Sequence, residues 1–119
     1  MVQKEDWDCG VACLAMLLGR TYAEVRARIR KYPDGVSNRQ MMRAAKALGQ
    51  PVSHRPHVGD EDVGILDLER ETDDRWEGHF AVYAKGTVYN PASGQWWMDL
   101  DTYLKYSRYR VCGLFVRVG

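Results

Sequence analysis

The spacing of hydrophobic and polar positions changes near the middle of the chain. Up to Gly49 the apolar residues recur at helical spacing, whereas the later segments alternate over short runs, as half-buried strands do. A block of helices followed by strands that pair as hairpins is typical of the α+β class. We therefore predict three short N-terminal helices packed on a small antiparallel β-sheet, in a single domain over residues 1–119.

Local signals place the ends of the three helices. Asp8 is a candidate N-cap for an apolar helix that ends at Gly19, a residue suited to the left-handed C-terminal position. Thr21–Glu24 and Ser37–Gln40 each match the Ser/Thr-x-x-Glu/Gln pattern of a capping box, and Gly49 closes the third helix. Each helix is thus delimited by its own neighbouring residues.

The second half of the chain predicts strands and one further helix. Lys85 and Gly86 form a tight turn of the kind that joins two hairpin strands. A helix is expected from Asp99 or Asp101 to Tyr106. The predicted strands are Val52–Arg55, Val63–Leu68, His79–Ala84, Thr87–Asn90 and Tyr109–Val118.

Composition and charge exclude several classes of protein. Hydrophobic residues make up 45% of the 119 residues and charged residues 28%, which is an ordinary globular composition. The formal net charge of +1 argues against a nucleic-acid partner, which would require a basic footprint. A membrane span needs about 18 consecutive apolar residues, and the sequence has no such run.

The cysteines and the polar N-terminus suggest a compartment. The residues before the first apolar run do not resemble a secretory signal. Three cysteines without such a signal indicate thiols in a reducing environment rather than a disulfide framework. We therefore expect the chain to be cytoplasmic.

Four residues form a candidate catalytic constellation. Cys9 opens the first helix, where the partial positive charge of the helix end favours a thiolate. His79 is the candidate general base, and Asn90 at the end of the paired strand is able to reach its distal ring nitrogen and select the tautomer. The side chain of Gln3 and the backbone N–H of Cys9 are candidate donors of an oxyanion hole. These residues predict thiol-dependent attack on a carbonyl carbon.

The motifs around these residues resemble a known family. Gln3 followed by Asp8–Gly19 is similar to the nucleophile motif of the bacteriocin-processing peptidases, papain-like cysteine peptidases that cut leader peptides after a double glycine. Gly78–Tyr83 and Val88–Gly94 resemble the histidine strand of that family and its following turn. The resemblance covers most of the chain, about residues 3–94, and implies a papain-like α+β fold acting on a peptide or protein substrate.

The resemblance also implies roles for the four residues. It makes Cys9 the nucleophile, His79 the general base, Asn90 the orienting residue and Gln3 the oxyanion donor. Asn90 departs from the family, which usually has Asp at this position, although papain itself uses Asn. An amide orients the imidazole without adding charge, so the imidazolium is less stabilised. The expected function is cleavage of a peptide or isopeptide bond through a Cys-His-Asn acyl-enzyme.

Two other functions of the same fold stay open, together with a metal-site alternative. The chain is alternatively a catalytically silent peptide-binding module, or an enzyme of related thiol acyl-transfer or deconjugation chemistry. Cys9 and Cys13, one helical turn apart, would also allow zinc with His54, His57 or His79, but no second pair has ligand spacing. We therefore expect no metal or cofactor, a buried Cys13, and solvent-facing loop positions for His54 and His57.

Overall fold

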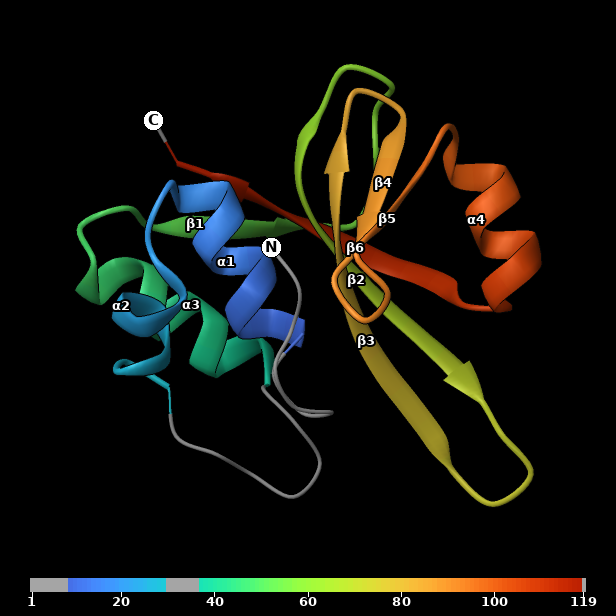
Figure 1. Cartoon of the computed structure of the whole chain (residues 1–119), viewed down its shortest axis with the longest axis horizontal. Helices are drawn as coiled ribbons and strands as arrows, with labels where there is room; N and C mark the ends of the chain where they lie inside the picture. Colours follow the sequence, from blue (N-terminus) through green and yellow to red (C-terminus); the bar gives the residue numbers. More distant parts are fainter. Residues whose placement is uncertain (1–8, 30–36, 119) are drawn as a thin grey trace.

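The computed structural model describes residues 9–29 and 37–118, shown in Figure 1. These residues form helices and strands in the order expected of an α+β protein, as predicted. The helices are α1 (Cys9–Leu18), α2 (Tyr22–Arg26), α3 (Asn38–Ala47) and α4 (Leu100–Ser107). The strands are β1 (Val52–Arg55), β2 (Val63–Glu71), β3 (Trp76–Ala84), β4 (Thr87–Asn90), β5 (Gln95–Trp97) and β6 (Arg110–Arg117).

The described strands form one antiparallel sheet in the order β1-β6-β2-β3-β4-β5. β2 and β3 are longer than predicted, because their pairing continues through polar residues to Glu71 and Trp76. This extension projects from the rest of the sheet as a long hairpin (Figure 1). β5 was not predicted, since three residues are too short for an alternating pattern to be visible.

The helix boundaries agree with the local signals in the sequence. Thr21 and Ser37 both form complete capping boxes, in which the cap side chain and the third residue of the helix bond to each other's backbone. Gly19 and Gly49 have φ angles of 65° and 74°, the left-handed conformation expected after a helix. The predicted cap of α1, Asp8, lies outside the described residues.

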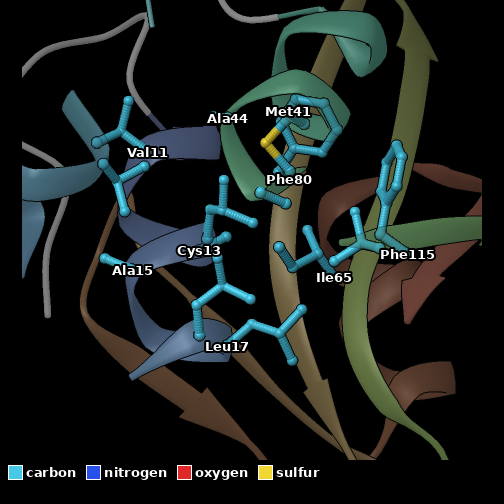
Figure 2. Close-up of a cluster of buried hydrophobic side chains, with 14 of the residues drawn as sticks. Val11, Cys13, Ala15, Leu17, Met41, Ala44, Ile65, Phe80 and Phe115 are labelled. Carbon is cyan, nitrogen blue, oxygen red and sulfur yellow. The ribbon is translucent and has the colours of Figure 1, made fainter. Parts of the chain in front are cut away.

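Hydrophobic side chains cover both faces of the sheet. On one face, α1 and α3 pack against β2, β3 and β6 around a core that includes Cys13, Met41 and Phe115 (Figure 2). On the opposite face, Tyr103 of α4 packs in a second core with Ala81 and other strand residues. The sheet therefore lies between two hydrophobic cores. Among the described residues, no helix is long and apolar enough to cross a membrane.

Candidate active site

His79 and Asn90 are joined by a direct hydrogen bond across the β3–β4 hairpin. The Lys85-Gly86 turn has positive φ at both positions, 49° and 94°, which suits the twist of a two-residue hairpin. The strands pair from Ala84 and Thr87 back to Val82 and Tyr89, so Asn90 lies diagonally across from His79. The His79 Nε2 atom is 2.9 Å from the Asn90 Oδ1 atom. The contact that the sequence suggested is therefore present.

A second hydrogen bond defines the tautomer of His79. The backbone N–H of Ala92 donates to the same Asn90 oxygen at 3.1 Å, and a backbone N–H is only a donor. The Asn90 atom that faces His79 is therefore the amide oxygen, which only accepts. His79 must carry its proton on Nε2 to make this bond, and its Nδ1 atom is then able to accept a proton from a thiol.

The surroundings of His79 favour the neutral ring. Burial lowers the pKa of His79, the hydrogen bond to Asn90 opposes that shift, and the positive charge of Arg70 lowers the pKa further while Glu77 raises it. The ring of Tyr109 stacks on the imidazole with centroids 5.3 Å apart and an interplanar angle of 15°. A half-buried, neutral imidazole is a proton acceptor at neutral pH.

Cys9 is the first residue of α1 and is 8% exposed. α1 packs against β3, and its N-terminal end faces that strand in Figure 1. Burial raises the pKa of the Tyr109 hydroxyl, the charge of Arg70 lowers it, and negative charge at Glu77 and then at Cys9 raises it. Tyr109 is therefore stacked on the candidate base, and its hydroxyl is sensitive to the charge of the candidate nucleophile.

The other two cysteines lie in environments that disfavour a thiolate. Cys13 is fully buried, as predicted, and its pKa is raised by burial and then by the charge of Cys9. The pKa of Cys112 is raised by partial burial and by Asp67 and Glu69. All three cysteines are within the described residues, and none forms a disulfide. Cys9 is the cysteine whose position at a helix N-terminus favours ionisation.

The remaining predicted residues have different outcomes. Gln3, the expected oxyanion donor, lies outside the described residues, so its role stays a prediction. His57 is exposed on a loop as expected. His54 is also exposed as expected, but it lies within β1, the strand predicted over Val52–Arg55, and its Nε2 atom is 3.0 Å from Asp67 Oδ2. In the described ranges, His, Cys, Asp and Glu side chains form no group of three or more that is arranged to hold a metal ion.

The sequence interpretation missed two residues that surround the candidate base. Tyr109 lies just before β6 and was assigned only to an alternating strand, and Arg70 lies on a part of β2 that was not predicted. Their relation to His79 depends on the pairing of β2 with β3 and β6, which joins segments far apart in the chain. No local pattern in the sequence indicates that relation.

Comparison with known proteins shows the fold. No protein-family model and no curated protein sequence matches the chain. Among solved structures, the chain is similar to the crystal structure of a double glycine motif protease from an AMS/PCAT transporter in complex with the leader peptide. The TM-score is 0.68 at 19% sequence identity, covering 98% of this chain and 88% of the other. The similarity confirms the predicted α+β, papain-like fold.

Proposed function

We propose that the chain is a cysteine peptidase that cleaves a peptide or isopeptide bond through an acyl-enzyme on Cys9. The observation that carries the proposal is the hydrogen bond from His79 Nε2 to Asn90 Oδ1, which leaves Nδ1 as a proton acceptor. The fold similarity to a double glycine motif protease supports the same class of reaction. Since that protease is bound to a leader peptide, a peptide with a double glycine is the first substrate to test.

The reaction follows from the properties of the three side chains. His79 takes the proton of the Cys9 thiol, and the thiolate attacks the carbonyl carbon to give a tetrahedral oxyanion. The backbone N–H of Cys9, at the start of α1, and the side chain of Gln3 are the proposed donors to that oxygen. The imidazolium then returns its proton to the leaving amine. Water attacks the thioester with His79 as base and releases the acid product and the thiol.

Selective alkylation tests the dyad without a substrate. Iodoacetamide should label Cys9 at pH 6 much faster than Cys13 and Cys112, because burial raises the pKa of both other thiols. His79→Ala should remove this preference, as quantified by mass spectrometry of the labelled peptides. The matched control is His57→Ala, since His57 is an exposed histidine on a loop. Equal and slow labelling of all three cysteines in the unmodified chain would contradict the proposal.

The same chain distinguishes a peptidase from a binding module. Cleavage of a double-glycine peptide by the intact chain, and its loss in Cys9→Ala, are expected for the peptidase. Cys9→Ala should still bind the peptide, measured by isothermal titration calorimetry. Binding without cleavage by the unmodified chain would instead favour the catalytically silent peptide-binding module.

A further inference from the structure

Tyr109 connects the candidate base to a fixed guanidinium group. Its ring stacks on His79, and the Arg70 Cζ atom lies 4.5 Å from the centroid of the same ring. A guanidinium within about 6 Å of an aromatic centroid is attracted by the negative charge of the ring face. Tyr109 is therefore in contact with a cation and with the imidazole.

Arg70 is itself held by two hydrogen bonds. Its Nε atom donates to Glu77 Oε2 at 2.9 Å, and its Nη1 atom donates to the carbonyl oxygen of Ser107 at 2.8 Å. Arg70 and Glu77 are directly opposite each other in the β2–β3 pairing, and Ser107 is the last residue of α4. The guanidinium thus has donors directed to both the hairpin and the helix.

The end of α4 determines where Tyr109 enters the sheet. Arg108 is in the left-handed conformation, with φ 64°, and its N–H donates to the Leu104 carbonyl at 2.8 Å. This conformation ends the helix and turns the chain toward β6. Tyr109 follows immediately, and its N–H donates to the Ser107 hydroxyl at 3.3 Å. The backbone before the ring is therefore defined by local hydrogen bonds.

The stack supplies a constraint that the hydrogen bond to Asn90 does not. A single hydrogen bond at Nε2 fixes one atom of an imidazole, and the ring is still able to tilt about that contact. A parallel aromatic ring restricts the tilt, because offset stacking favours one relative orientation of the two planes. Together the two contacts define both the position of Nε2 and the plane that contains Nδ1.

We propose that Tyr109 and Arg70 are positioning residues for His79, and that they keep the imidazole plane oriented so that Nδ1 accepts the thiol proton. This inference rests on the proposed function of His79 as general base. Tyr109 acts through its ring face, and Arg70 acts through Tyr109 and through its charge. Neither residue is assigned a contact with substrate.

The first test separates the ring face from the hydroxyl group. Tyr109→Leu should lower kcat for the double-glycine peptide by about 10- to 100-fold with little change in KM, because a misoriented catalytic group affects the chemical step. Tyr109→Phe keeps the ring face and should restore kcat. The ¹⁵N NMR signals of His79 should show the Nε2–H tautomer in the unmodified chain and in Tyr109→Phe. They should show a mixture of tautomers in Tyr109→Leu.

The second test uses opposite charges around the same histidine. In a Cys9→Ala background, which removes the coupled thiol, Arg70→Gln should raise the pKa of His79 in an NMR titration, and Glu77→Gln should lower it. Arg110→Gln is the matched control, because Arg110 also lies over an aromatic ring, Trp76, and also pairs with a glutamate, Glu69. Arg110→Gln should leave the His79 titration unchanged.

The outcomes distinguish failure of the positioning role from failure of the proposed function. An unchanged kcat and tautomer in a folded Tyr109→Leu variant would overturn the positioning role of Tyr109. If Tyr109→Leu does not fold, an unchanged tautomer and titration of His79 in Arg70→Gln overturn the inference instead. Absence of His79-dependent alkylation in the unmodified chain would contradict the proposed function, while the tautomer measurements would still report on the positioning of the ring.

Discussion

Two histidines of this sheet bond to a side-chain oxygen, in different surroundings. His79 donates from Nε2 to the amide oxygen of Asn90 at 2.9 Å, and His54 places Nε2 3.0 Å from the carboxylate of Asp67. The ring of His79 is stacked on Tyr109, whereas His54 meets the edge of Phe115 and has a 32% exposed side chain. β1, which carries His54, is one edge strand of the sheet, whereas β4, which carries Asn90, lies next to the opposite edge strand, β5.

The difference shows that a histidine beside an acidic group is not by itself a candidate base. The Asp67 carboxylate also accepts a hydrogen bond from the side chain of Asn38 at 3.0 Å, so it connects α3, β1 and β2. That arrangement is a structural junction between the helices and the sheet. The hydrogen bond that defines its tautomer and the stacked ring of Tyr109 distinguish His79 from His54, although only His54 has a carboxylate partner.

Substitution of each histidine in turn should give the largest difference in kcat/KM between the two sites. His79→Gln is expected to lower kcat/KM by about 10²–10⁴-fold, because general base catalysis typically contributes that much. His54→Gln should leave kcat/KM close to the unmodified value, since its partner Asp67 belongs to the junction. Steady-state cleavage of the double-glycine peptide by both variants measures the difference. A large loss in His54→Gln, at unchanged thermal stability, would reverse the assignment.

A glycine on β6 allows the junction to be disturbed without changing the candidate base. A Cβ atom at Gly113 would overlap the His54 ring and the carbonyl oxygen of Arg55. Gly113→Ala is therefore expected to lower the free energy of unfolding by about 1–3 kcal/mol, the typical cost of overpacking. Urea denaturation measures the change. Gly78→Ala is the control, because its nearest neighbour, the Leu68 oxygen, lies 4.0 Å away, and an equal loss there would contradict the explanation.

Exchange of the two acceptors tests the effect of charge. Asn90→Asp should raise the pKa of His79, because a carboxylate stabilises the imidazolium. Asp67→Asn should not change the pKa of His79, since Asp67 is bonded to His54 and Asn38 instead. NMR titration of both variants in the Cys9→Ala background measures this directly. A pKa of His79 that falls in Asn90→Asp would show that the two side chains are not in contact.

The smallest expected effect concerns stability against pH. Folding lowers the pKa of His79 from the value in the unfolded chain, which is about 6.5. Between these two pKa values the unfolded chain therefore binds more protons than the folded chain. The free energy of unfolding should therefore decrease as the pH falls through this window. Urea denaturation of Cys9→Ala from pH 7.5 to 5 should show this slope, and His79→Gln in the same background should flatten it. A slope of opposite sign would contradict a His79 pKa that folding lowers.

Local signals in the sequence predicted much of the fold. The capping boxes at Thr21 and Ser37 and the Lys85-Gly86 turn depend on neighbouring residues, and the structure contains all three. The extension of β2 and β3 to Glu71 and Trp76 could not be predicted from hydrophobic alternation, because backbone pairing continues there without a buried face. Register between strands is a property of the pair and not of either segment.

The candidate site likewise contains one contact that could be predicted from the sequence and others that could not. The contact of His79 with Asn90 was predictable, because a two-residue turn places the ends of two short strands together. The stacking of Tyr109 on His79, and of Arg70 on Tyr109, was not predictable. These contacts depend on β2, β6 and the end of α4, which are far apart in the chain. Likewise, no local pattern indicated the bond between His54 and Asp67, which lie on different strands.

The hairpin that joins His79 to Asn90 has a consequence for the order of folding. The two residues are 11 positions apart, so the loop that must close between them is short and its entropy cost is small. Cys9 lies on a separate element near the other end of the chain and reaches the sheet only when α1 packs on β3. We expect the candidate base, His79, and its amide partner, Asn90, to assemble first. On the proposed function, the Cys9 thiol then keeps the reactivity of an ordinary cysteine until α1 packs on β3.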